Sequence, residues 1–399
     1  MGKIELTDDI YWVGAIDWNL RDFHGYTTPR GGTYNAYLIV DEKIALVDTV
    51  KYAFADEMFE RIKEIVDPRK IDYVISNNVE ADHSGSLPEI MKFATNAEVI
   101  CTEKGKEGLL KYYSISGNFR TVKTGDELKL GKKTLFFLTV PMLHWPDSMA
   151  TFIKEDKLLL SNDLFGQHFA SSFRFDEGAE DPPGYESDIV MEEASKYYAN
   201  IFMQFGDLIL KKIEEMQELD ITPKMIAPSH GIIWKNPDKI LDAYHNWGKG
   251  ISKQKVLVIY DTMWNSTEIM AKEISRGVSD SGVEVSLFHL RRNEWSEIVK
   301  EVLESKAILI GSPTLNNDIF PPVSGFLTYL MGLRPKSKIW ATFGSYGWAG
   351  GAVRAINEKL KSAGNETVES LEVRFRPDES ELAKCYLMGQ KIASVVKKA

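Results

Sequence analysis

The sequence predicts an α/β protein of two domains, with two mixed sheets flanked by helices in the first and a small doubly wound parallel sheet in the second. The chain has 399 residues, which is long for a single hydrophobic core. β-rich runs joined by short turns dominate its start, whereas strands and helices alternate strictly from Lys255 onward. The polar segment 249–255 (KGISKQK) separates the two patterns. We therefore expect a first domain at residues 1–249, a linker at 250–254 and a second domain at 255–399.

The first domain starts with three runs typical of antiparallel strands: IYWVGAI (10–16), YNAYLIV (34–40) and KIALVDTV (43–50). The pattern then predicts helix 54–66, strand 71–77, helix 86–94, strand 98–102 and a helix near 103–113. Further β-type runs at 119–125, 134–140, 149–154 and 157–162 precede a long helical tract from about 186 to 218. A strand at 225–229 and a helix ending near His245 close the domain. This order fits two mixed sheets flanked by helices.

The second domain contains five apolar runs that are typical of buried strands: 255–261, 284–290, 307–313, 338–346 and 368–375. Helical segments follow them near 266–281, 293–304, 321–332, 350–363 and 378–396. Five strands alternating with five helices predict a doubly wound parallel sheet, in which ligands bind at the carboxyl ends of the strands.

Composition excludes several classes of function. A net charge of −10 and a pI near 5.4 give no basic surface for nucleic acid. The apolar runs are strand-sized, well below the roughly 20 residues that cross a bilayer, and the first residues lack the apolar core of a signal peptide, so we expect a cytoplasmic protein. Cys101 and Cys385 stand alone, so the chain has no CxxC pair for an iron–sulfur centre.

Six candidate metal ligands follow the ends of predicted strands. They are Glu80, Asp82 and His83 in NNVEADHSGS, His144 in PMLHWPDS, Asp163 in SNDLFGQH and His230 in APSHGIIW. Each one alone is readily explained as an ordinary loop residue, but together they indicate one site. Asp163 is the natural bridge between two ions, with Glu80 and His144 on one ion and Asp82, His83 and His230 on the other.

The first cluster distinguishes two kinds of metal chemistry. A zinc hydrolase of the metallo-β-lactamase type has the pattern H-x-H-x-D-H, whereas this chain has Asn78-Val79-Glu80-Ala81-Asp82-His83. Two imidazoles and a carboxylate per metal suit redox-active iron, while zinc in such a hydrolytic site usually has more imidazole. The carboxylate at Glu80 therefore favours electron transfer.

Three loops of the second domain predict a mononucleotide site. The loop after the first strand is rich in hydroxyl groups and leads into a helix, whose N-terminus favours a phosphate. The chain lacks the GxxxxGK and GxGxxG patterns of nucleoside triphosphate and dinucleotide sites. The predicted binding residues are Thr262, Met263, Trp264, Asn265, Ser266 and Thr267, then Pro313, Thr314, Leu315, Asn316 and Asn317, then Ser345, Tyr346, Gly347, Trp348 and Gly350.

The motifs resemble those of the flavodiiron proteins, also called A-type flavoproteins, from about Ile10 to Val396. The matching strings are DFHGYTT, RGGTYNAYLI, E-x-D-H at 80–83, PMLHWPDS, SNDLFGQHFA, KYYANI, APSHGIIW, YDTMWNST, GSPTLNND and FGSYGWAGG. The resemblance implies a metallo-β-lactamase-like αββα sandwich with two non-haem iron ions, followed by a flavodoxin-like domain with FMN. The activity it implies is reduction of dioxygen to water or of nitric oxide to nitrous oxide.

The resemblance also assigns roles outside the six ligands. The family has histidine where this chain has Asn78, so either the amide oxygen or a water is expected at that position, and one iron is expected to be held more weakly and to be more open. His24 and either Tyr197 or Tyr198, of which we select Tyr198, are expected in the pocket above the metals. His168 is a further candidate near the metals, whereas His245 and His289 match no motif and are read as structural.

The resemblance implies partners as well. A head-to-tail homodimer, which can pair further into a dimer of dimers, brings each flavin beside the partner's irons. The missing CxxC pair implies a separate electron donor such as rubredoxin. Two alternatives stay open at this point: a zinc hydrolase with a fused flavodoxin domain, and a gas or redox sensor whose metal site is altered at Asn78.

Overall fold

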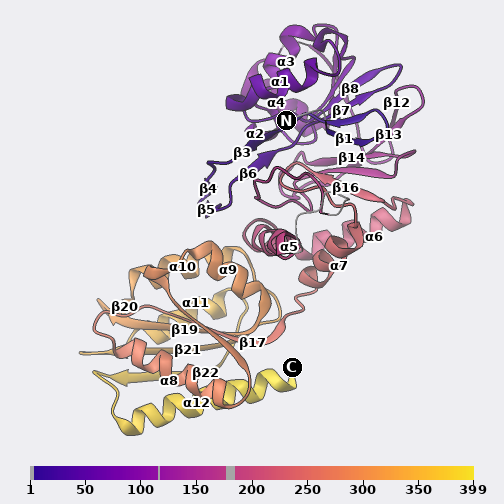
Figure 1. Ribbon diagram of the computed structural model, residues 1–399. Helices are drawn as coiled ribbons and strands as arrows, with labels where there is room; N and C mark the ends of the chain where they lie inside the picture. The colour runs from indigo at the N-terminus through magenta and orange to yellow at the C-terminus, as the bar shows by residue number, and fades with distance from the viewer. Residues whose placement is uncertain (1–3, 116, 177–184) are drawn as a thin grey trace. The chain divides into compact units, whose positions relative to one another are not determined.

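The computed structural model describes residues 4–115, 117–176 and 185–399, which form two compact units (Figure 1). The first unit contains Met1–Tyr198 and Asp207–His245, and the second contains Ala199–Gly206 and Asn246–Ala399. A short segment within the predicted helical tract 186–218 therefore groups with the second unit. No helix within the described ranges is both long enough and apolar enough to span a membrane.

The first unit contains a seven-stranded sheet with the order β1-β2-β7-β8-β9-β10-β11. Its strands are β1 (Ile4–Thr7), β2 (Ile10–Trp12), β7 (Tyr37–Val40), β8 (Ile44–Val47), β9 (Tyr73–Ile75), β10 (Glu98–Cys101) and β11 (Asn118–Thr121). The pairs from β1 to β8 are antiparallel, and those from β8 to β11 are parallel. The predicted antiparallel start is confirmed.

A five-stranded sheet forms the second layer, with the order β12-β13-β14-β15-β16. Its strands are β12 (Glu127–Lys129), β13 (Thr134–Thr139), β14 (Met149–Ile153), β15 (Leu158–Asn162) and β16 (Met225–Pro228). The first pairs are antiparallel, whereas β15 and β16 run parallel. Two short ribbons, β3 (Ala15–Asp17) with β6 (Gly32–Tyr34) and β4 (Asp22–Phe23) with β5 (Tyr26–Thr27), complete the strands of this unit.

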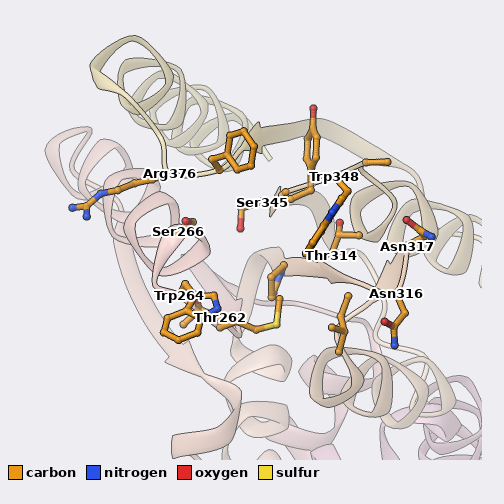
Figure 2. A pocket seen from close by; sticks show the side chains of 16 residues that line it. Thr262, Trp264, Ser266, Thr314, Asn316, Asn317, Ser345, Trp348 and Arg376 are labelled. Atoms are coloured by element: carbon orange, nitrogen blue, oxygen red, sulfur yellow. The ribbon is translucent and has the colours of Figure 1, made fainter.

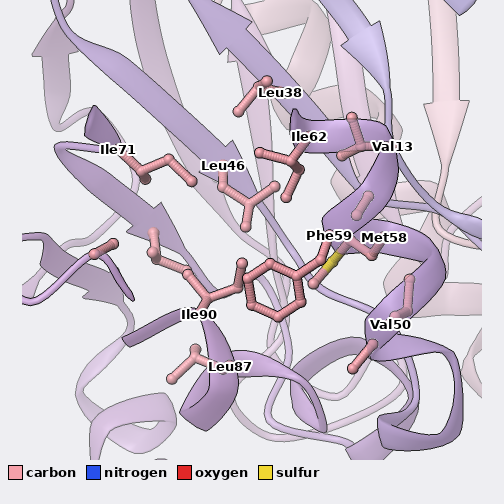
Figure 3. Packing of buried hydrophobic residues seen from close by; sticks show 14 of the residues in the cluster. Val13, Leu38, Leu46, Val50, Met58, Phe59, Ile62, Ile71, Leu87 and Ile90 are labelled. Atoms are coloured by element: carbon pink, nitrogen blue, oxygen red, sulfur yellow. The ribbon is translucent and has the colours of Figure 1, made fainter. Parts of the chain in front are cut away.

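Alternation along the strands builds two cores in the first unit. In β8, Ala45 and Val47 belong to the cluster between the two sheets, while Leu46 belongs to the cluster beneath helices. Figure 3 shows Leu46 close to Phe59 and Ile62 of helix α1. Each such fully buried side chain stabilises the fold by roughly 1.5–3 kcal/mol. The seven-stranded sheet thus buries one face against helices and the other against the second sheet, as an αββα sandwich requires.

Helices cover the outer faces of both sheets in the first unit. Those on the seven-stranded sheet are α1 (Ala55–Lys63), α3 (Leu87–Phe93) and α4 (Glu103–Tyr113), and α2 (Ala81–Ser84) is a single turn beside them. Later in the chain come α5 (Tyr185–Tyr197), α6 (Gly206–Glu218) and α7 (Pro237–Gly248). Lys212 of α6 donates to the carbonyl of Thr139 at 2.8 Å, and Tyr244 of α7 accepts from the N–H of Phe165 at 3.0 Å, which attaches these helices to the five-stranded sheet.

The helical tract predicted at 186–218 is interrupted rather than continuous. A π-helical turn (Tyr198–Phe202) and a 3-10 turn (Met203–Phe205) separate α5 from α6. Asn200 in this break donates to the carbonyl of Ser296 at 3.1 Å and accepts from the hydroxyl of Tyr329 at 2.6 Å. The break is explained by these contacts, because they tie 199–206 to the second unit. Such long-range partners leave no periodic signal in the sequence.

The second unit is a parallel sheet with the order β18-β17-β19-β21-β22. Its strands are β17 (Lys253–Tyr260), β18 (Glu284–His289), β19 (Ser305–Leu315), β21 (Ile339–Tyr346) and β22 (Thr367–Arg374), and the short β20 (Asp318–Ile319) pairs with β19. Its helices are α8 (Ser266–Asp280), α9 (Trp295–Glu304), α10 (Pro321–Gly332), α11 (Ala352–Ser362) and α12 (Glu379–Lys398). Figure 1 shows α8 and α12 on one side of the sheet and α9 and α10 on the other. The predicted doubly wound sheet is confirmed.

Candidate functional site

Strand ends of the first unit bring six of the predicted ligands together. The loop after β9 and the single turn α2 hold Glu80, Asp82 and His83, while His144 lies in the loop that follows β13. Asp163 and His230 follow β15 and β16, which run parallel and place Asn162 opposite Pro228. Parallel neighbours carry the residues after their carboxyl ends to the same edge of the sheet, which explains why residues so distant in sequence meet.

The first ligand group consists of Asp82, His83 and His230, whose ligand atoms all lie within 4.8 Å of one another. Nε2 of His230 is 3.1 Å from Oδ2 of Asp82. Nδ1 of His230 lies 2.7 Å from the backbone carbonyl of Thr33, an oxygen that only accepts, so the ring donates there. This hydrogen bond leaves Nε2 as the basic nitrogen, which is how proteins usually orient a metal-binding imidazole.

The second ligand group consists of Glu80, His144 and Asp163. Nε2 of His144 is 3.4 Å from Oε2 of Glu80 and 3.8 Å from Oδ2 of Asp163. The other oxygen of Asp163, Oδ1, faces the first group, at 3.1 Å from Nε2 of His83 and 3.4 Å from Nε2 of His230. Asp163 thus offers one oxygen to each group, as a bridge between two ions must.

Unpartnered buried atoms indicate that these groups are built for cations. Both oxygens of Asp82, both ring nitrogens of His83, Nε2 of His230 and Oε2 of Glu80 are buried without a hydrogen-bond partner. Burying such atoms unpaired is costly, and a metal ion removes the cost for those that it binds, which is one nitrogen of each imidazole. The donor set of imidazoles and carboxylates, with one carboxylate shared, fits two iron ions.

Electrostatics within the site favours ionised carboxylates. Burial by itself raises the pKa of the Asp163 carboxyl, but the imidazoles of His83 and His230 outweigh it and hold the pKa well below its usual range. Burial likewise opposes ionisation of Asp82, and the same imidazoles lower the pKa of its carboxyl to about 2. The site therefore keeps its buried carboxylates ionised, and ionised carboxylate oxygens are the form that binds a metal ion.

Asn78, the seventh predicted position, lies beside the second group. The oxygen and the nitrogen of its side-chain amide have different hydrogen-bond partners. Its Oδ1 accepts from the N–H of Glu80 at 2.8 Å. Its Nδ2 donates to Oδ2 of Asp163 at 2.9 Å and faces Oδ1 of Asn162 at 3.3 Å. The NH₂ end of the amide, rather than its oxygen, is turned to the shared carboxylate.

Three of the four further predicted residues lie against the ligands. Nε2 of His24, whose side chain is 51% exposed, lies 2.5 Å from Oε1 of Glu80, and this hydrogen bond raises the pKa of the imidazole. The hydroxyl that reaches the cluster is that of Tyr197, which donates to Oδ1 of Asp163 at 3.1 Å. The ring of Tyr198, the residue selected from the sequence, packs against Tyr244 instead, with ring centroids 5.0 Å apart.

The difference between the two tyrosines follows from helix geometry, because adjacent residues on a helix point about 100° apart and only one can face the ligands.

His168 is fully buried, and its ring centroid lies 4.8 Å from that of His230, so it packs beside a ligand. Neither ring nitrogen of His168 has a hydrogen-bond partner, and burial holds the pKa of this imidazole well below its usual range.

A cavity of about 940 Å³ opens at the carboxyl ends of the strands in the second unit (Figure 2). Figure 2 shows the labelled side chains of the three predicted loops converging on it. Its lining residues are Thr262, Met263, Trp264, Ser266, Pro313, Thr314, Leu315, Asn316, Asn317, Ser345, Tyr346, Gly347, Trp348, Ala349, Phe375 and Arg376. Phe375 and Arg376 were missed from the sequence because they follow β22, whose end carries no glycine-rich or hydroxyl-rich loop.

Three predicted residues, Asn265, Thr267 and Gly350, lie outside this lining. Asn265 precedes α8 with a φ of 65° and makes no side-chain hydrogen bond to the helix. Thr267 is buried, and its hydroxyl lies 2.9 Å from that of Ser345, so it joins two of the loops. A Cβ at Gly350 would approach the carboxylate of Glu372 to 2.8 Å, a contact that the exposed Glu372 side chain can relieve by moving.

The cavity fits a flat ring with a phosphate. The first turn of α8 is not capped by Asn265, so its N–H groups are available to an anion, and the buried hydroxyl of Thr262 has no partner. Trp264 and Trp348 are 90% and 95% exposed although they line the cavity. Large apolar rings in such positions are stabilised by stacking against a planar ligand.

Buried charges support the phosphate loop, and the sequence did not reveal them. Asp261, which is fully buried, accepts from the N–H of Thr262 at 2.6 Å and from Nε of Arg291 at 2.9 Å. His289, predicted as structural, lies 3.1 Å from the same carboxylate and stacks on Tyr260. These contacts fix the backbone at which the loop begins.

Known proteins match the chain over almost its full length. Residues 33–231 match the ODP family beta lactamase domain and residues 258–389 match flavodoxin. The chain is 49% identical to a nitric oxide reductase of Moorella thermoacetica, over 98% of both chains.

Two solved structures are similar to the fold. The rubredoxin oxygen:oxidoreductase of Desulfovibrio gigas has a TM-score of 0.95 at 36% identity, covering 100% of this chain and 99% of its own. The flavodiiron protein of Giardia intestinalis has a TM-score of 0.93 at 34% identity, covering 100% of this chain and 97% of its own. The chain therefore belongs to the flavodiiron proteins, which join a lactamase-like diiron domain to a flavodoxin domain that binds FMN.

Proposed function

We propose that this protein is an oxidoreductase that reduces dioxygen to water, nitric oxide to nitrous oxide, or both. The observation that carries the proposal is the shared carboxylate of Asp163, which offers one oxygen to each of two ligand groups. The donor set, the FMN-sized cavity and the relative named nitric oxide reductase support the same activity. The carboxylate of Glu80 in the second group disfavours the zinc hydrolase alternative.

The cofactors set the electron count. When bound, two ferrous ions would supply two electrons and reduced FMN two more, the four that one dioxygen and four protons need to become two waters. Two nitric oxides and two protons need only two electrons to become nitrous oxide and one water. The residues of this chain have to hold the ions at a fixed separation, admit the gas and supply protons.

His24 is placed to handle a proton at the second ligand group. Its Nε2 is 2.5 Å from Oε1 of Glu80, and that hydrogen bond raises the pKa of the imidazole, so the ring binds a proton more tightly than a free histidine does. Because the side chain is half exposed, it can exchange that proton with solvent. Oε2 of Glu80 stays unpartnered beside His144 and is the oxygen available to a metal.

The electrons have to reach the metals from outside. Both cysteines are buried and burial raises the pKa of each thiol to about 12, so neither is suited to hold an iron–sulfur centre. We infer a separate donor of the rubredoxin type, in line with the name of the Desulfovibrio gigas relative. We also infer a head-to-tail homodimer in which the flavin of one subunit recharges the metals of the other, with the exposed Trp264 and Trp348 at the dimer contact.

The deciding experiment combines cofactor analysis with turnover. Purified protein should contain two irons and one FMN per chain, and anaerobic assays with reduced rubredoxin should consume dioxygen or nitric oxide at a steady rate. Colourless protein, or protein with zinc and no flavin, would contradict the proposal. Sedimentation of the same sample tests the dimer, because a fully active monomer is incompatible with transfer between subunits.

A further inference from the structure

Asn78 is completely buried beside the second ligand group, at the position where the family pattern has histidine. Its hydrogen bonds determine which way its amide faces. The N–H of Glu80 can only donate, so the Asn78 atom that it meets at 2.8 Å is the oxygen. The carboxylate of Asp163 can only accept while it is ionised, so the Asn78 atom at 2.9 Å is the nitrogen.

A buried row of amides behind Asn78 reinforces this orientation. Asn162 directs its Nδ2 to Asp48 at 3.5 Å and therefore presents its oxygen to Asn78. Asp48 also accepts from the N–H and the Nδ2 of Asn77, at 2.7 and 3.0 Å, and Thr151 donates to the oxygen of Asn77 at 2.9 Å. Turning the Asn78 amide over would leave the Glu80 N–H without an acceptor. It would also place the Asn78 oxygen against the side-chain oxygens of Asn162 and Asp163.

Asn78 and Tyr197 hold opposite oxygens of the shared carboxylate. Asn78 donates to Oδ2 of Asp163, the oxygen on the side of Glu80 and His144. Tyr197 donates to Oδ1, the oxygen on the side of His83 and His230. The two donors together fix the tilt of a carboxylate that has to reach two ions.

From these contacts we infer that Asn78 is a positioning residue and not a metal ligand. Its NH₂ group holds Oδ2 of Asp163, and its oxygen holds the backbone of Glu80. An ion in the second group would then be held by three protein ligands, Glu80, His144 and Asp163, and would leave its other positions to water or the gas. This inference rests on the proposed diiron function.

The direct test is a crystal structure of the iron-loaded native protein, with anomalous scattering to locate each ion. We expect the oxygen of Asn78 to remain on the Glu80 N–H. An Asn78 oxygen at metal-ligand distance from an iron, about 2.0–2.2 Å, would overturn the inference while leaving the diiron function intact. Absence of iron at both positions would instead refute the proposed function.

Anaerobic release of ferrous iron to a chelator provides a second test. The native protein should lose one iron in a fast phase and the other in a slow phase. Asn78→His adds an imidazole donor and should slow the fast phase at least about 10-fold, whereas Asn78→Ala removes the hydrogen bonds and should accelerate it by about 10- to 100-fold.

Asn118→His is the matched control, because it adds an imidazole at an exposed position of the same unit. Both release phases should be unchanged in this variant. If Asn78→Ala released iron at the native rate, Asn78 would have no positioning role. If Asn78→His did not fold, the crystal structure of the native protein would still decide the question.

Discussion

Gly231→Ala tests how tightly the backbone after His230 is confined. Gly231 has a φ of +82°, and an added Cβ would lie 1.3 Å from Oε1 of Gln167 and 2.3 Å from its backbone oxygen. The left-handed conformation costs alanine about 1–2 kcal/mol. Moving Gln167 also breaks its hydrogen bonds to the carbonyl and the N–H of Ile232, which lie 3.1 and 2.5 Å away, at roughly 1–3 kcal/mol for each buried group left unpaired. Together these effects predict a loss of about 4 kcal/mol or more in the free energy of unfolding.

Gly125→Ala is the matched control, because Gly125 has a φ of +95° in the same unit with nothing within 4 Å of an added Cβ. It should cost only the conformational strain, about 1–2 kcal/mol. Urea unfolding of both variants and iron per chain are the measurements. Gly231→Ala should also lose iron, because the shift displaces His230, whereas Gly125→Ala should retain it. Equal losses of stability in the two variants would refute the reasoning.

Three further predictions concern the sites themselves. Tyr197→Phe removes the donor to Oδ1 of Asp163 and should weaken iron binding about 10-fold in a chelator competition, whereas Tyr198→Phe, whose ring packs on Tyr244, should bind iron as the native protein does. Trp348→Ala removes an exposed ring at the cavity and should lower the affinity for FMN about 10-fold in a fluorescence titration, without altering the iron content. An unchanged affinity for FMN would exclude stacking on this ring. Chelation of the metals should lower the unfolding midpoint of the first unit, because both ligand groups found among the described residues lie in that unit. An equal fall in the second unit would count against the assignment.

Much of the fold and of the ligand set could be predicted from local patterns. β-rich and apolar runs predicted the strands of both units. The strict strand and helix rhythm after Lys255 predicted the doubly wound sheet, although β17 begins two residues earlier, at Lys253. The ligand types predicted from the turn motifs also meet in space, because strand ends direct nearby residues to one edge of a sheet.

The sequence by itself determined which chemical groups are present and at which strand ends they stand, because strand and turn propensities are local properties of neighbouring residues. Only the tertiary structure decided how those groups face one another. The amide of Asn78 is oriented by Asn162, 84 positions away in the chain, and the choice of Tyr197 over Tyr198 depends on contact with Asp163. Hydrogen bonds to buried groups are directional and join distant segments, so their arrangement exists only after the chain has folded.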